Sequence, residues 1–284
     1  MLRLDKTAIQ NDVHKLFYGS SSGKLWEGAE WIETNGLGGW ASSSLSGCNT
    51  RRYHGILVAA TKPPTERTVL VNKLDEIIVL NDEWIHLSTN KFRDALSPQG
   101  YVHINEFKKD LFPEFTYEVN GVVIKKTIAM LHGENTTVII YNVLQAPSSF
   151  TLKLLPLITG RDYHSLHKAN TVFDTSYTFE NGLFTTQPYP GTPPIFISIP
   201  NASLRLDPNW FYQFDYAIDR YRGMECEEDL FNHGTFSLSL NAGDSFGVIL
   251  STTNPSGRDA FYLYEQERIR RVELLDGKST KGYV

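Results

Sequence analysis

From about residue 52 to residue 250, the hydrophobic positions occur as short runs of β-branched and aromatic residues, and turn-forming residues separate the runs. In the run TFSLSL, Phe236, Leu238 and Leu240 alternate with threonine and serine, so one face of the segment is apolar and the other is polar. This alternation is typical of a half-buried strand. Because the chain shows neither a repeat of fixed period nor a recurring strand-then-amphipathic-helix unit, we expect an all-β, antiparallel fold.

Four pairs of these runs are joined by turn residues, and each pair predicts a β-hairpin. The clearest signal is Asn120-Gly121 between EFTYEV and VVIKKTIAML, because both residues tolerate the positive φ of a two-residue type I′ turn. The same reasoning pairs SYTFE with LFTTQ across an Asn-Gly at 181–182, and IIVL with EWIHL across an Asn-Asp at 81–82. It also pairs TFSLSL with SFGVILST across residues 241–244.

One helix is predicted late in the chain, over residues 259–275, where apolar residues recur at helical spacing. Ser256 or Asn254 offers a polar side chain for a cap near its start. Glu267 stands four residues before Arg271, an order that favours helix stability. Gly277 is expected to end the helix, and the polar, aperiodic residues after it are typical of a linker.

Composition narrows the class of protein. The chain has 284 residues, of which 41% are hydrophobic and 12% aromatic, enough for the core of one large domain. The net charge of -5 is mild, and lysine and arginine are scattered along the chain. This distribution argues against binding to nucleic acid or to an anionic membrane, and it favours a neutral partner such as a sugar.

The chain carries no evident targeting or metal-binding signal. Its first 16 residues lack the apolar core of a secretory signal, and no apolar run approaches the roughly 18 residues of a membrane span. Cys48 and Cys226 are too few for a disulfide framework and lack the paired spacing of a zinc site. We therefore expect a soluble, cytoplasmic protein with two reduced cysteines and with no cofactor or bound metal.

Residues 30–55 are rich in glycine and poor in β-branched residues, so we expect a long, shaped loop here. Gly36, Gly38 and Ala41 formally match the pattern G-x-G-x-x-A. No amphipathic helix follows, however, and no acidic residue lies about 20 positions further on. Dinucleotide binding is therefore disfavoured.

The segment NTRRYHG brings Arg51, Arg52, Tyr53 and His54 together near the start of a predicted strand. Guanidinium, phenol and imidazole groups can hydrogen-bond sugar hydroxyls or carboxylates. They can equally brace a loop or a domain interface, and the sequence leaves both roles open. Strand alternation would place Arg52 and His54 on one face and Tyr53 on the other.

A second polar segment, residues 159–167, follows the apolar run LKLLPLI and carries Arg161, Asp162, His164 and His167. We expect a polar loop with an internal contact between Arg161 and Asp162. Metal binding by Asp162, His164 and His167 is the alternative, although the segment supplies neither a further ligand nor a helix that would align the two histidines.

Two further segments could carry chemistry. The acidic run of Glu225, Glu227, Glu228 and Asp229 is expected to form a solvated face, with a catalytic carboxylate as the alternative. The aromatic segment 210–221, which begins with Trp210, is expected to pack in a core or an interface. Stacking of these rings on sugars is its alternative role.

Several motifs, taken in order, resemble the N-terminal domain of bacterial and archaeal-type glycogen debranching enzymes. They are WIETNGLGG, NTRRYHGIL, RTVLVNKLDE, PLITGRDYHSLH, WFYQFDYAIDRYR and EEDLFN, and together they span nearly the whole chain. Trp40, Cys48 and His233 depart from the family's pattern, which leaves the fine specificity open.

The resemblance implies a β-supersandwich over residues 1–255. Residues 256–284 would then hold a linker helix and the start of an (α/α)6 barrel that carries the amylo-α-1,6-glucosidase carboxylates. This chain would be non-catalytic by itself and would shape the binding of glycogen or maltooligosaccharide by the barrel; an independent starch- or glycogen-binding module and a 4-α-glucanotransferase domain are the alternatives. The residues expected to contact substrate or the missing domain are Asn35, Arg51, Arg52, Tyr53, His54, Arg161, Asp162, His164 and Trp210.

Overall fold

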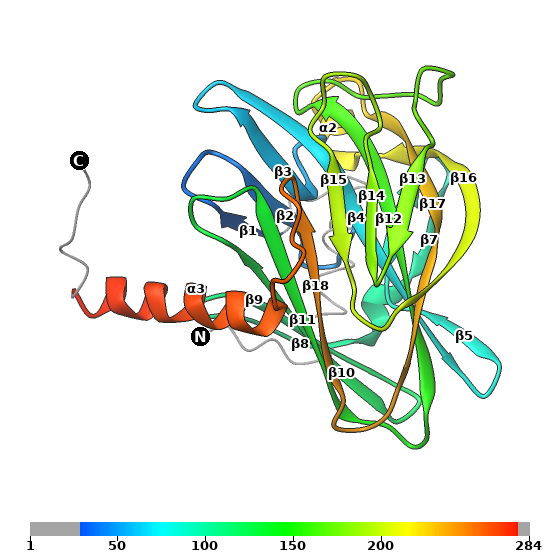
Figure 1. Cartoon of the computed structure of the whole chain (residues 1–284). Helices are drawn as coiled ribbons and strands as arrows, with labels where there is room; N and C mark the ends of the chain where they lie inside the picture. The colour runs from blue at the N-terminus through cyan, green and yellow to red at the C-terminus, as the bar shows by residue number, and fades with distance from the viewer. Residues whose placement is uncertain (1–28, 278–284) are drawn as a thin grey trace.

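The computed structural model of the protein describes residues 29–277, so the N-terminal segment and the last part of the predicted linker lie outside the described residues. Within that range the chain forms two antiparallel sheets and a C-terminal helix, which confirms the predicted all-β class (Figure 1). No helix in residues 29–277 has the length and apolar character needed to cross a membrane.

The larger sheet has ten strands within the described residues. In spatial order they are β1 (Glu30–Thr34), β2 (Trp40–Ser44), β3 (Gly55–Lys62), β4 (Glu66–Leu80), β12 (Phe150–Asp162), β17 (Glu227–Leu240), β16 (Ser203–Asp215), β6 (Thr89–Phe92) and β7 (Ala95–Gln99), with β5 (Glu83–His86) paired to β4.

The smaller sheet has eight strands in the same part of the chain. Their order is β13 (Tyr177–Glu180), β14 (Leu183–Thr186), β15 (Ile195–Ser198), β18 (Ser245–Ser251), β11 (Thr136–Gln145), β10 (Val122–Met130), β9 (Pro113–Val119) and β8 (Ile104–Lys109). The helical elements are η1 (Gly100–His103), α2 (Ala217–Tyr221) and α3 (Ala260–Leu275).

The core lies between the two sheets. Leu57, Leu152 and Phe236 from the larger sheet and Ile124 and Ile139 from the smaller one belong to a single buried cluster. Full burial of such a side chain contributes about 1.5–3 kcal/mol relative to exposure. The alternation read in TFSLSL is confirmed, because Phe236 and its alternate neighbours are the buried residues of that segment.

Three of the four predicted hairpins are confirmed, namely β9–β10, β13–β14 and β4–β5. Both residues of each turn have positive φ, as at Asn120 (48°) and Gly121 (79°). The fourth is wrong: β17 pairs with β12 and β16, whereas β18 belongs to the other sheet. Four extended residues span about 13 Å, which is enough to cross the roughly 10 Å between packed sheets. Residues 241–244 therefore connect β17 of the larger sheet to β18 of the smaller sheet, and they do not join two neighbouring strands of one sheet.

The long loop predicted over residues 30–55 is also wrong in part, because β1 and β2 form an antiparallel hairpin there. Trp31, Glu33 and Ala41 are buried although small and polar residues surround them in the sequence. A second correction follows from the start of β3 at Gly55, since Arg52 and Tyr53 lie in a turn. The predicted strand alternation across Arg52 and His54 therefore does not apply.

The predicted late helix is confirmed as α3, and its cap is Asp259, whose side chain accepts a hydrogen bond from the Tyr262 N–H at 2.8 Å. Ala260 and Leu263 pack against the smaller sheet in a second buried cluster. The helix projects to one side of the sandwich (Figure 1), and Tyr264 in its second turn lies 5.1 Å from the Phe112 ring. Apolar and aromatic packing thus anchors the first two turns of α3.

Candidate functional site

The turn between β2 and β3 is tied to β1 by one carboxylate. Arg51 Nε donates to Glu30 Oε1 at 2.7 Å, and His54 Nε2 lies 3.3 Å from the same oxygen. His54 Nδ1 accepts from the Thr50 N–H at 3.1 Å. Burial alone would raise the pKa of Glu30, but His54 and Arg51 outweigh it and lower this pKa to about 2. Arg51 and His54 therefore hold the turn in place.

Arg52 connects four segments of the chain. Its backbone N–H and its Nε donate to Oδ2 of the buried Asp219 on α2, at 2.8 and 3.2 Å. Its Nη1 donates to the carbonyl of His164 after β12, and its Nη2 donates to the carbonyl of Glu225 before β17. Each guanidinium nitrogen of Arg52 thus has a protein partner. The sequence left two roles open for this residue, ligand contact and loop bracing, and these contacts fit loop bracing.

Beneath Arg52 lies a buried ion pair between adjacent strands. Arg161 on β12 donates through Nε and Nη2 to the two carboxylate oxygens of Glu228 on β17, and its Nη2 also donates to the Arg52 carbonyl at 2.7 Å. Thr159 and Tyr216 donate to the same carboxylate. Burial lowers the pKa of Arg161, but the charge of Glu228 outweighs it and the pKa is raised.

Two predictions about these segments are wrong. Arg161 is a buried strand residue, and it reaches Asp162 only through that residue's backbone carbonyl, at 3.3 Å. The acidic run is not a uniformly solvated face, because Glu228 and Asp229 are buried. In both cases a charged residue is paired across strands, and local sequence does not encode that pairing.

Beside this network, four rings and one guanidinium group that are at least partly exposed gather into a cluster that we call the aromatic rim: Trp40, Tyr53, Tyr163 and His164, with Arg67. The ring centroids of Tyr163 and His164 are 3.9 Å apart, and Tyr53 lies 5.6 Å from His164 and 5.9 Å from Tyr163. Trp40 meets Tyr163 edge-on at 5.7 Å, and Arg67 lies over both of these rings. Rings with polar tips, next to a cation, suit a ligand that has both apolar faces and hydroxyl groups.

The sequence of residues 29–247 matches the family described as "Glycogen debranching enzyme N terminal". The match covers every strand except the last part of β18, and it includes every segment that builds the aromatic rim. The chain belongs to the glycogen debranching enzyme N-terminal family. No curated protein matches it in sequence.

Two solved structures resemble this family member at a distance. A heparan sulfate lyase HepC mutant from Pedobacter heparinus is 12% identical with a TM-score of 0.34, over 61% of this chain and 23% of that chain. A bacterial glucoamylase complexed with acarbose is 10% identical with a TM-score of 0.42, over 86% of this chain and 36% of that chain. The debranching-enzyme N-terminal chain thus spans well under half the length of either protein.

In this family domain, two of the expected site residues are not members of the rim. Asn35 is fully buried in the β1–β2 turn, where its side chain accepts from Gly39 N–H and donates to Glu134 and Asn135. Trp210 on β16 packs edge-on against Phe173 and Phe231. The side chains of Asn35 and Trp210 thus contact other residues of the domain.

The remaining expected residues are brought together. Tyr53 and His164 belong to the rim, and Asp162 accepts a hydrogen bond from the His164 N–H at 2.8 Å. Within residues 29–277, no three His, Cys, Asp or Glu side chains are placed to hold a metal ion, so the alternative of a metal site at Asp162, His164 and His167 has no structural support. Sequence reasoning missed Tyr163, although it lies between two residues that were singled out.

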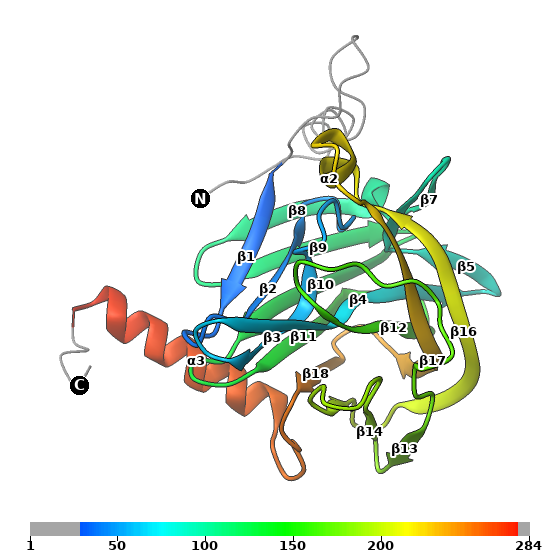
Figure 2. The same cartoon turned by 90° about the horizontal axis from the view of Figure 1, so that it is seen from above.

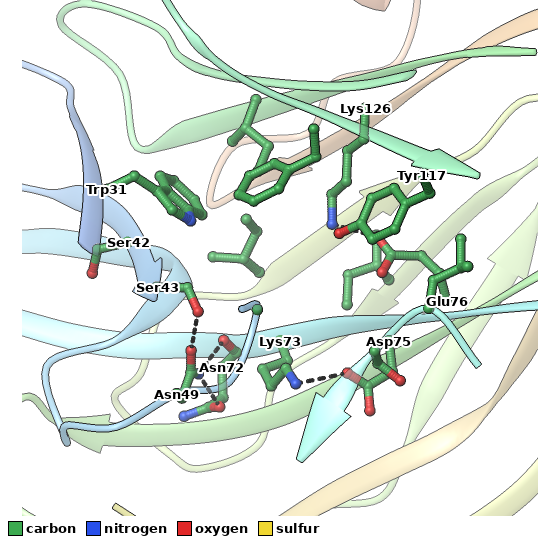
Figure 3. A pocket seen from close by; sticks show the side chains of 17 residues that line it. Trp31, Ser42, Ser43, Asn49, Asn72, Lys73, Asp75, Glu76, Tyr117 and Lys126 are labelled. Carbon is green, nitrogen blue, oxygen red and sulfur yellow. Dashed lines mark hydrogen bonds and ion pairs between the residues drawn. The ribbon is translucent and has the colours of Figure 1, made fainter. Parts of the chain in front are cut away.

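A second candidate site is a small cavity with charged residues in its lining, between the sheets of the debranching-enzyme N-terminal domain (Figure 3). Lys73 pairs with Asp75 at 3.1 Å, and Lys126 pairs with Glu76. Trp31 also lines this space, and its Nε1 is buried without a hydrogen-bond partner. The volume is ≈ 50 Å³, which suits a few water molecules and excludes a sugar. The aromatic rim is therefore the stronger candidate for a glucan.

Proposed function

We propose that this chain is the N-terminal domain of a glucan-active enzyme and that it binds and orients an α-glucan through the aromatic rim. In this proposal the domain comprises residues 1–255, and residues 256–284 lead into an (α/α)6 barrel whose carboxylates cleave the bond. The partners are glycogen or a maltooligosaccharide and that catalytic domain. The two free cysteines fit the reducing cytoplasm as the location.

The observation that carries the proposal is the rigid support of the rim rings. Arg52 ties the Tyr53 turn to the His164 segment and to Asp219, and Trp40 Nε1 donates to the Tyr53 carbonyl at 2.8 Å. Rings held in this way lose little conformational freedom when a ligand binds. A pyranose has an apolar face for the rings of Tyr53 and Tyr163 and hydroxyl groups for their phenols.

The carboxylates under the rim support a positioning role. Asp219 accepts from Arg52 and Glu228 accepts from Arg161, and both carboxylates are buried. A general acid or base needs a proton-accepting oxygen within reach of the substrate. In this proposal the domain accelerates cleavage by holding the branched glucan in register with the barrel, an effect of proximity and orientation.

Calorimetric titration of the purified chain with maltoheptaose tests the proposal. We expect saturable heat with the parent chain and about fivefold weaker binding for Tyr163→Ala, since a lost aromatic contact is worth ~1 kcal/mol. Tyr262→Ala, which removes an exposed tyrosine on α3, is the matched control and should bind like the parent. Absence of heat with the parent would contradict the proposal and favour a purely structural partner of the barrel.

The same samples address the alternative functions. A product assay on maltoheptaose should show no shortened or lengthened chains, because the proposal places bond chemistry on another domain. Redistribution of chain lengths by the purified chain would instead establish the 4-α-glucanotransferase alternative. Tight binding without any contribution of the domain to cleavage in the full-length enzyme would favour an independent binding module.

A further inference from the structure

An open groove runs along β13, the edge strand of the smaller sheet, where it passes β16 of the larger sheet. It consists of two hollows of ≈ 470 and ≈ 530 Å³ that share Phe179 as a lining residue. Each hollow falls within the size range of small-molecule sites, about 300–1,000 Å³. The groove is therefore large enough for sugar residues, in contrast to the cavity in the core.

The groove is lined without a formal charge. None of the described residues that line the two hollows is acidic, basic or a histidine, and most carry a hydroxyl group, an amide or an aliphatic side chain. Leu206 on the β16 wall is 46% exposed. Such a lining does not favour a charged peptide or a nucleic acid, and it matches a neutral ligand with hydroxyl groups and apolar patches.

Tyr177 supplies a supported aromatic platform in this groove. Its ring stacks on Phe184 with centroids 5.7 Å apart and an interplanar angle of 11°, and Phe184 is itself buried. Phe184 meets Phe236 of the core edge-on at 5.8 Å. Phe184 supports the Tyr177 ring from the core side, and 40% of Tyr177 remains exposed, so the residue is accessible to a ligand.

The segment that leads into β13 is also fixed. The N–H of Ser176 donates to Asp174 Oδ1 at 2.8 Å, and the Thr186 hydroxyl donates to the Ser176 carbonyl at 2.8 Å. These bonds hold the residue before Tyr177 on both sides. The platform is thus preorganised, which reduces the ordering cost of binding.

We propose that the groove between β13 and β16 is a second glucan-binding site, which stacks a neutral α-glucan chain on Tyr177. This inference rests on the proposed function for the class of ligand, but it concerns a separate surface. In Figure 2, β13 and β14 lie on the opposite side of the molecule from α2, which adjoins the rim. Two sites on one domain would hold different branches of one polymer. Once one branch is bound, the other is present at a high effective concentration near the second site, so the domain binds the polymer more tightly than either site alone.

Affinity electrophoresis in gels that contain glycogen tests this inference. Tyr177→Ala should weaken the apparent affinity for glycogen at least fivefold, whereas Tyr177→Phe, which keeps the stacking ring, should retain it. Tyr212→Ala is the matched control, because Tyr212 is 58% exposed on β16 but does not line the groove. Thermal unfolding of each variant establishes that it is folded.

A second variant, Leu206→Asp, places a charge on the opposite wall and leaves the stack of Tyr177 on Phe184 intact. It should weaken glycogen binding to a similar extent. If both variants migrate like the parent while Tyr163→Ala is impaired, the second site is overturned and the proposed function stands. If glycogen does not retard the parent chain, the second site and the proposed function are both contradicted. Concentration-dependent dimerisation that Leu206→Asp abolishes would identify the groove as a contact between two copies, and it would also overturn the inference.

Discussion

The Arg161 guanidinium donates to both carboxylate oxygens of Glu228, and neither side chain is exposed to solvent. The pair joins β12 to β17 directly beneath the Arg52 turn, because Arg161 also donates to the Arg52 carbonyl. A buried pair of this kind adds little net stability over an apolar pair of equal volume, yet removal of one partner leaves an uncompensated buried charge. Its role is to set the position of the turn that carries Tyr53.

Glu228→Gln should therefore destabilise the chain by about 3–5 kcal/mol, since Arg161 would lose its counter-charge in the interior. Urea unfolding monitored by circular dichroism measures this difference. Glu225→Gln makes the same change in charge at an exposed position three residues away and should stay within about 0.5 kcal/mol of the parent. Equal stability of the two variants would show that Arg161 and Glu228 do not form the buried pair.

Replacing Arg52 should impair the rim without removing a ligand contact. Arg52→Ala leaves the buried Asp219 without its guanidinium donor, at a cost of about 1.5–3 kcal/mol. We expect faster proteolysis after residue 163 and weaker maltoheptaose binding, because the His164 segment loses its tie. Arg205→Ala, at an exposed position on β16, is the control. Unchanged proteolysis of Arg52→Ala would contradict the bracing role.

Glu30 predicts a specific dependence of stability on pH. Its pKa is about 2 in the folded chain against an ordinary value of 4.5. Because the folded pKa is the lower one, the contribution of Glu30 is fully present above pH 4.5 and is lost as the pH falls from 4.5 towards 2. The stability difference between the parent and Glu30→Gln should thus shrink as the pH falls from 4.5 towards 2. Urea unfolding at several pH values measures it.

The control for Glu30 is Glu66→Gln, since Glu66 is exposed and pairs only with Lys62 on the surface. Its difference from the parent should be small and nearly independent of pH. A stability difference for Glu30→Gln that stays constant down to pH 2.5 would contradict the ion pairs of Glu30 with Arg51 and His54.

The orientation of α3 should depend on Arg271. This residue lies 2.6 Å from Glu33 on β1 and 2.8 Å from Glu267 on its own helix, and its guanidinium covers the Phe112 ring at 4.2 Å. Arg271→Ala should lower amide protection along the second half of α3 in hydrogen exchange. Arg268→Ala breaks only an exposed pair with Glu265 and should leave that protection unchanged. Equal protection in both variants would show that Glu33 does not anchor the helix.

The strand pattern and most of the turns could be predicted from sequence because they depend on local chemistry. Alternation in TFSLSL and the Asn-Gly turn at residue 120 are properties of a few adjacent residues. The change of sheet between β17 and β18 could not be predicted, since a four-residue connection serves a hairpin and a sheet crossing equally well. The β1–β2 hairpin was hidden for a similar reason: the buried Glu33 pairs with Arg271 and Lys109, which are both distant in sequence.

The candidate site shows the same division. Composition and motif pointed to the Arg51–His54 turn and to the segment around Arg161, and the structure brings these segments together through Arg52. Asn35 and Trp210 take no part in the hydrogen bonds of Arg52. A polar residue is buried and structural, or exposed, according to the partners that the fold brings to it. For Arg52 and Arg161 these partners are Asp219 and Glu228, which lie 60 or more positions away in the chain.

The most direct test of the account is to map bound maltoheptaose on the isotope-labelled chain by NMR, following backbone amide shifts during a titration. The account predicts saturable shifts in two separate clusters, one around Trp40, Tyr53 and Tyr163 and the other around Tyr177 and Leu206. Shifts confined to other surfaces, or none at ligand concentrations in the millimolar range, would contradict the claim that this domain positions a glucan.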